Sequence, residues 1–170
     1  CEPARNVLFG YHPQAQGAGW VLPQRDIFLT SNPKKNFAGA DFARAGSVNG
    51  LMNLFRPSDV TIGPDGAIYL ADWFDARVGG HGTRDAGQTG AIYRIAPTGA
   101  TLSIPTLDLS TTKGQIEALK NPSPNVRELG RSRLVASGEK VIPAVKTRLK
   151  DTNRFIRGRA IWVLAQLGAK

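Results

Sequence analysis

Hydrophobic and polar residues alternate in the central part of the chain, as they do in β-strands with one buried face. Ile68 and Leu70 alternate with Tyr and Ala neighbours in residues 67–71, which is the period of two expected of a half-buried strand. Residues 59–62 and 92–95 are similarly rich in β-forming side chains. The pattern predicts strand, turn, strand, loop and strand, which together form a β-meander.

The segment between the first two of these strands has the chemistry of a tight turn. Pro64 pre-sets its own φ, Asp65 can bond its own backbone, and Gly66 accepts a positive φ. Pro57 opens the first strand and Trp73 follows the second. We therefore expect these five residues to be structural.

The spacing of apolar residues changes from two to about 3.6 beyond residue 110. Residues 119–138 align without gaps with residues 149–168, at a spacing of 30. Residues 139–149 between them are predicted to form another helix. Repeated pairs of helices at such a spacing are typical of an α-solenoid, although two helices can also be similar by coincidence.

The helical pattern also predicts which side chains share one core. Lys120, Arg131 and Lys150 are expected outside it. The last helix has an apolar face up to the end of the sequence, so we expect further repeats beyond it. The predicted core comprises Val126, Leu134, Ile142, Val145, Leu149, Ile156, Ala160, Leu164 and Leu167.

Two modules follow from these patterns. Residues 6–11, 20–22 and 26–30 are predicted strands, and residues 101–109 a last strand or an extended exit. We expect the change from strand to helix between residues 107 and 113. The predicted domains are 1–109, all-β, and 110–170, all-α.

Charge is distributed unevenly between the modules. The formal net charge is +9. Residues 1–107 hold nine Lys and Arg against eight Asp and Glu, whereas residues 108–170 hold thirteen against five. A basic helical face suits nucleic acid or an acidic partner, or it is simply a solvated charged surface. No helix-turn-helix or aromatic stacking pattern accompanies the charge, so no nucleic-acid motif is evident.

The composition argues against a membrane-spanning segment and an internal disulfide in this sequence. Hydrophobic residues make up 41% of the 170 residues, and no apolar run approaches the length that spans a membrane. Cys1 is the only cysteine, which excludes an internal disulfide. The chain begins without a basic-then-apolar leader, and we interpret it as a fragment of a longer protein. Trp20, Trp73 and Trp162 are expected to pack in cores.

The strongest candidates for chemistry lie at the end of the second central strand and in the loop after it. A histidine near carboxylates can act as a general base or bind a metal. Zinc is not indicated, because there is one histidine and no second His or Cys nearby, whereas calcium accepts carboxylate and carbonyl oxygens. The alternative is that the carboxylates bind turn amides and pair with an arginine. The candidates are Asp72, Asp75, Arg77, His81, Arg84 and Asp85.

The ordered motifs GPDGAIYLADW, GGHG and IYRIAP resemble a blade of the pyrroloquinoline-quinone-dependent sugar-dehydrogenase-like propellers. The same motifs resemble those of bacterial "membrane-bound dehydrogenase" proteins, in which HEAT repeats follow a propeller. They also resemble the NHL blade pattern. It covers residues 2–30 and 54–170. The resemblance implies closing blades of a β-propeller followed by HEAT-like repeats, with pyrroloquinoline quinone and Ca²⁺ in the parent protein, a c-type haem downstream and a periplasmic location. It transfers no catalytic residue to this chain.

Two hypotheses of function follow. The first is a fragment of an extracytoplasmic quinone-dependent sugar or alcohol dehydrogenase-like protein, inactive by itself. The second is a non-catalytic propeller and HEAT scaffold that binds a protein or a carbohydrate. A haem-attachment motif further along the parent chain would favour the first.

Overall fold

A computed structural model describes residues 1–32, 55–73 and 90–169. Contacts between residues divide the chain into two units. The first contains residues 1–60 and 69–95, and the second contains residues 61–68 and 96–170. The predicted candidates Asp75, Arg77, His81, Arg84 and Asp85 lie outside the described residues.

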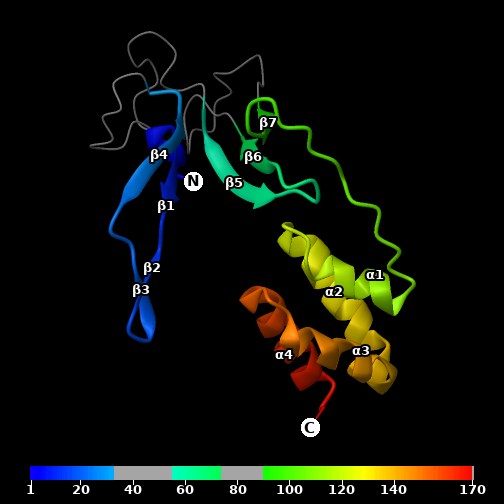
Figure 1. Cartoon of the computed structure of the whole chain (residues 1–170). Helices are drawn as coiled ribbons and strands as arrows, with labels where there is room; N and C mark the ends of the chain where they lie inside the picture. Colours follow the sequence, from blue (N-terminus) through cyan, green and yellow to red (C-terminus); the bar gives the residue numbers. More distant parts are fainter. Residues whose placement is uncertain (33–54, 74–89, 170) are drawn as a thin grey trace, which may run out of the picture. The chain divides into compact units, whose positions relative to one another are not determined.

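Two small hairpins occupy the N-terminal part of the chain. The 3₁₀ turn η1 (Pro3–Arg5) leads into β1 (Val7–Tyr11), which pairs antiparallel with β4 (Arg25–Thr30) and has a bulge after Leu8. In the stretch of sequence that connects β1 to β4, β2 (Gln14–Gln16) and β3 (Gly19–Val21) form a second antiparallel pair. The strands predicted at 6–11, 20–22 and 26–30 are therefore present (Figure 1).

The predicted meander is present as a sheet in the order β5-β6-β7 (Figure 1). Its turn has the expected chemistry, because Asp65 Oδ1 accepts a hydrogen bond of 3.0 Å from the Ala67 N–H. The Gly66 N–H also donates to the Gly63 carbonyl at 3.0 Å, and Gly66 has φ +85°, where a side chain would be strained. The strands are β5 (Pro57–Ile62), β6 (Ile68–Asp72) and β7 (Ala91–Ile95).

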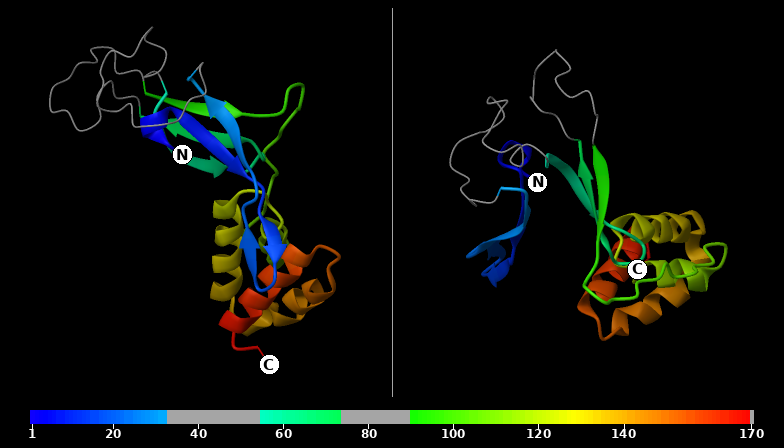
Figure 2. Two further views of the ribbon diagram at one scale, coloured as in Figure 1. Left: turned by 90° about the vertical axis from the view of Figure 1, so that its left-hand side faces the viewer. Right: turned by 90° about the horizontal axis from the view of Figure 1, so that it is seen from above.

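Four α-helices and two 3₁₀ turns form the C-terminal part of the chain, and the helices lie together in all three views (Figures 1 and 2). None of the helices in residues 1–32, 55–73 or 90–169 has the length and apolar composition needed to span a membrane. The elements are α1 (Thr112–Ala118), α2 (Pro124–Ala136), η4 (Gly138–Val141), α3 (Ile142–Lys146), η5 (Thr147–Lys150) and α4 (Arg154–Gln166).

The helices begin at residues that satisfy free backbone N–H groups. Thr111 Oγ1 accepts from the Gly114 N–H at 3.1 Å at the start of α1, and Asn153 Oδ1 accepts from the Phe155 N–H at 2.9 Å at the start of α4. Pro124 occupies the first position of α2, where no N–H is needed. The sequence therefore sets the starts of α1, α2 and α4 locally, whereas α3 has no side-chain cap.

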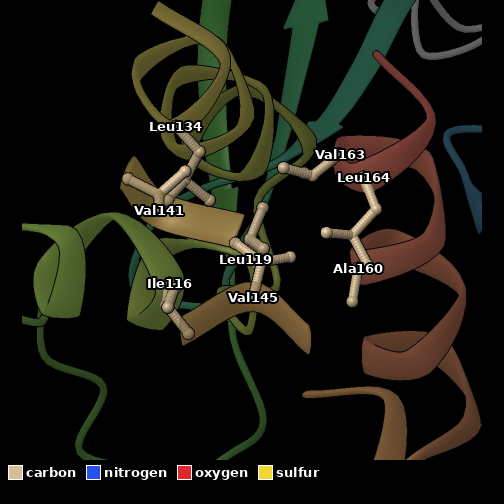
Figure 3. Packing of buried hydrophobic residues seen from close by; sticks show 8 residues of the cluster. All are labelled: Ile116, Leu119, Leu134, Val141, Val145, Ala160, Val163 and Leu164. Carbon is tan, nitrogen blue, oxygen red and sulfur yellow. The ribbon is translucent and has the colours of Figure 1, made fainter. Parts of the chain in front are cut away.

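One apolar core joins the four helices (Figure 3). Of the predicted core residues, Leu134, Val145, Ala160 and Leu164 lie in this buried cluster, which confirms this part of the prediction. Ile156 is buried as well, but it is not a member of the cluster. Ile142 and Leu167 pack against the cluster, Val126 is half-buried and Leu149 is exposed. The core also takes in Val163, which belongs to the apolar face of the last helix, and three residues that were not predicted: Ile116, Leu119 and Val141.

The spacing of 30 residues appears in the structure as a repeated local motif. Before α2, Asn121 Oδ1 accepts from the Ser123 N–H at 2.8 Å; before α4, Asp151 Oδ1 accepts from the Asn153 N–H at 3.0 Å. One turn into each helix, an arginine donates back to two carbonyls of that turn. The donor is Arg127 in α2 and Arg157 in α4.

The predicted architecture of propeller blades followed by a HEAT-like solenoid is wrong. In the described part, the sheets have two or three strands each and do not form four-stranded blades. The predicted helix 139–149 is divided into η4, α3 and η5, and the four helices surround one shared core. The observed fold is a mixed one of small sheets and a cluster of helices.

An extended segment separates the last strand from the first helix, and the helix begins within the predicted interval of residues 107–113. The last strand ends at Ile95 and the first α-helix begins at Thr112. Residues 101–108 form no strand, so the alternative of an extended exit describes them better. Pro97, Gly99 and Pro105 interrupt any strand pattern in this segment.

Candidate functional site

Asp72 is the one member of the predicted loop cluster within the described residues, and it is buried at the end of β6. Its Oδ1 accepts a hydrogen bond of 2.8 Å from the Arg56 N–H, which precedes β5. Its Oδ2 accepts from the Tyr93 hydroxyl on β7 at 3.4 Å. This carboxylate therefore ties the ends of three neighbouring strands together, as the alternative of a carboxylate that binds backbone amides requires.

The surroundings of Asp72 are polar, buried and well connected. The Arg56 guanidinium is fully buried and donates to the Pro3 carbonyl at 2.9 Å. Asn6, in a left-handed conformation, donates to the Phe55 carbonyl at 2.7 Å. Burial, and then the charge of Asp72, raise the pKa of Tyr93. The cluster holds η1 against the start of β5, which is a structural role.

A groove on the helices has a different character, because charged and aromatic side chains line it from α2 and α4. Its volume is about 220 Å³. We name it the arginine groove. Its lining residues are Leu119, Pro124, Arg127, Glu128, Arg131, Arg159 and Trp162.

Two arginines of the groove reach the same turn of chain from different helices. Arg127 Nη1, on α2, donates to the carbonyls of Asn121 and Pro122 at 2.9 and 2.6 Å. Arg159 Nη1, on α4, donates to the Leu119 carbonyl at 2.6 Å. Burial first, and then the positive charge of Arg127, lower the pKa of Arg159. The two cations are therefore close enough to repel each other.

The third arginine of the groove is neutralised. Arg131 Nε donates to Glu128 Oε2 at 2.8 Å, and its two Nη groups donate to Glu128 Oε1 and Gln166 Oε1. The hydrogen bond from Arg131 is the main reason why the pKa of Glu128 is lowered to about 2. Glu128 therefore stays ionised at any physiological pH, and the uncompensated positive charge lies on Arg127 and Arg159.

Trp162 stands in the groove with 71% of its surface exposed, so its predicted place in a core is wrong. Trp20 and Trp73 are also exposed, which corrects the same prediction for them. The apolar stripe of α4 itself contained the signal. At about 100° per residue, position 162 lies on the opposite side of the helix from Ile156 and Ala160. A tryptophan at that position is expected to be exposed rather than buried in the core, as observed.

A metal site finds no support within the described ranges, where no three His, Cys, Asp or Glu side chains gather in one place. Calcium at the loop after Asp72 stays a prediction, and so does the quinone that the resemblance implies for the parent protein. No family model, curated protein or solved structure matches the chain. Function is therefore argued from the geometry of the arginine groove.

Proposed function

We propose that this chain is a protein-binding module and that the arginine groove is its binding surface. The observation that carries the proposal is the exposed indole of Trp162 beside Arg127 and Arg159, neither of which has an ion-pair partner among the described residues. Tryptophan and arginine are the residues most enriched at the energetic centres of protein interfaces. A partner that covers the groove would remove the indole from water and supply the missing negative charge.

The rigidity of the groove supports the same proposal. Its walls belong to α2 and α4, which share one apolar core. The side chains of Arg127, Arg131 and Arg159 are each held by hydrogen bonds to the protein itself. A surface whose side chains are already ordered loses less conformational entropy when it binds.

A peptide-display selection against the full-length chain tests this function. We expect selected sequences to bind the unmodified protein and to lose affinity for the Trp162→Ala variant. Ile161→Ala is the matched control, because Ile161 is exposed on the same helix and does not line the groove. If no selected sequence distinguishes Trp162→Ala from Ile161→Ala, the groove is not the binding surface.

The dehydrogenase hypothesis stays a prediction, as does the periplasmic location that accompanies it. Both rest on the resemblance of the central motifs, and the candidate residues 75–85 lie outside the described part of the chain. No geometry among the described residues favours quinone chemistry over binding. The proposal of a binding module therefore uses the helices alone.

We expect the purified chain to show no dehydrogenase turnover with pyrroloquinoline quinone, calcium, a panel of sugars and an artificial electron acceptor. Within residues 1–32, 55–73 and 90–169, sheets of two and three strands provide little of the wall that a quinone site in a propeller channel requires. The measurement is reduction of the acceptor over time. Turnover that disappears in His81→Ala would make the loop an active site and contradict the binding proposal.

A further inference from the structure

The arginine groove holds two cations at one end and an aromatic surface beside them. The anchoring carbonyls of Leu119, Asn121 and Pro122 use only the Nη1 groups of Arg127 and Arg159. A guanidinium has five N–H donors in a planar fork. Each arginine therefore keeps donors for a ligand while its position is fixed.

An anion would correct an electrostatic imbalance at this point. Arg159 is partly removed from water and faces the charge of Arg127, which together lower its pKa. Arg131, by contrast, already has Glu128 as its partner. A carboxylate near Arg127 and Arg159 would offset both the repulsion and the loss of hydration, and carboxylates match the geometry of guanidinium donors.

The size and composition of the groove favour a peptide. Its volume of about 220 Å³ is below the roughly 300–1,000 Å³ of pockets that enclose whole drug-sized ligands. It therefore suits individual side chains of a longer partner. Trp162 and Pro124 provide an apolar contact next to the arginines.

We infer that the arginine groove binds an acidic peptide segment, with a side-chain carboxylate of Glu or Asp held by Arg127 and Arg159 and an apolar side chain against Trp162. This inference rests on the proposed function, because it names the class of partner for the same surface. Arg127 and Arg159 select the carboxylate, and Trp162 contributes affinity without regard to charge. The two roles can be separated by experiment.

The test is a titration of the full-length ¹⁵N-labelled chain with defined peptides, followed by the NMR signals of the Trp162 indole and the arginine Nε–H groups. The first probe is a short peptide of alternating Glu and Leu, acetylated and amidated so that its side chains supply the only carboxylates. The second replaces every Glu by Gln. We expect the Glu peptide to bind about ten-fold or more tightly than the Gln peptide, because its charge-assisted hydrogen bonds are lost with Gln.

Variants of the arginines separate charge from geometry. Arg127→Gln and Arg159→Gln are each expected to abolish most of the preference for Glu over Gln, whereas Arg159→Lys retains part of it without the planar fork. Arg133→Gln is the matched control, since it removes the same charge from an exposed position of α2 outside the groove. Trp162→Ala should weaken both peptides and leave their ratio unchanged. Helical circular dichroism confirms that each variant is folded.

Binding of the Glu peptide should also depend on pH, and we expect it to weaken by several-fold from about pH 7 to about pH 4, where more than half of the peptide's glutamate side chains are protonated because their pKa is about 4.3. The charged groups that line the groove are Arg127, Glu128 and Arg131 from α2 and Arg159 from α4. The arginines stay protonated, and Glu128, with its pKa lowered to about 2, stays ionised over this range. The Gln peptide should show no such change.

The outcomes distinguish this inference from the proposed function. Equal affinity for the Glu and Gln peptides, with display-selected sequences still dependent on Trp162, would overturn the carboxylate and leave the binding module intact. A single-stranded oligothymidylate that moves the same signals at lower concentration than the Glu peptide would replace the peptide by nucleic acid. An absence of response to every probe would overturn the inference, and the display result then decides the proposed function separately.

Discussion

Replacing Gly130 by alanine is expected to lower the free energy of unfolding by about 1–3 kcal/mol, although alanine is the better helix former. A Cβ at Gly130 would lie 2.6 Å from the Ala118 Cβ and 2.7 Å from the Gln115 carbonyl oxygen. Both atoms belong to α1, which crosses α2 at this point, so the two helices would have to separate. Chemical denaturation followed by the helical circular dichroism signal measures the change.

Gly158→Ala is the matched control for this substitution. Gly158 lies inside α4, and a Cβ there would have no heavy atom within 4 Å. The same change should therefore raise stability by up to about 1 kcal/mol through helix propensity alone. If both variants shift stability in the same direction, the close crossing of α1 and α2 is not what Gly130 provides.

A comparison of the two repeated helices explains why a glycine is needed at this position of α2 but not at the equivalent position of α4. At the spacing of 30, Gly130 in α2 corresponds to Ala160 in α4, and both positions are buried. α1 approaches Gly130 so closely that no Cβ fits, whereas the methyl group of Ala160 packs in the core. The two helices share a local pattern but not the same neighbours, and a stacked array would require the same neighbours.

Local elements were predictable because local chemistry determines them. The alternation around Ile68 and the Pro-Asp-Gly turn define β5, β6 and the turn between them, and Pro124 and Asn153 mark the starts of α2 and α4. The single helix predicted at 139–149 was wrong. It follows Gly138, which has φ +71°, and contains Pro143, and it divides into short turns.

The global arrangement was not predictable from these elements. The motif GPDGAIYLADW describes a turn and two strands, and the resemblance extended that local pattern to the closing blades of a propeller. How many strands join a sheet depends on contacts distant in sequence, such as the hydrogen bond from Asn6 to the Phe55 carbonyl, 49 residues away. Periodicity does not contain such contacts.

The candidate site likewise has one feature that the sequence predicts and one that it does not. The position of Trp162 opposite the apolar stripe of α4 could be calculated from the sequence. The meeting of Arg127 with Arg159 could not, because it depends on how α2 and α4 approach the end of α1. The charge excess of residues 108–170 indicated a basic surface, and the structure locates two of its uncompensated charges.

Leu134→Ala is expected to lower the free energy of unfolding by about 2–5 kcal/mol, the range for removing a large aliphatic side chain from a packed core. Leu134 on α2 is completely buried and lies in the cluster that joins the four helices (Figure 3). The cavity would border residues from several of these elements, and they cannot all move inward without breaking other contacts. Denaturant titration of the full-length chain gives the change in stability.

Leu129→Ala supplies the comparison within the same helix. Leu129 is 45% exposed, whereas Leu134 is 0% exposed, so the same change in chemistry should cost less than about 1 kcal/mol at position 129 because little area is removed from the core. Leu164→Ala, at the equivalent position of α4, should resemble Leu134→Ala. Equal losses for Leu129→Ala and Leu134→Ala would contradict the orientation of α2, and with it the placement of Arg127 and Arg131 on the groove.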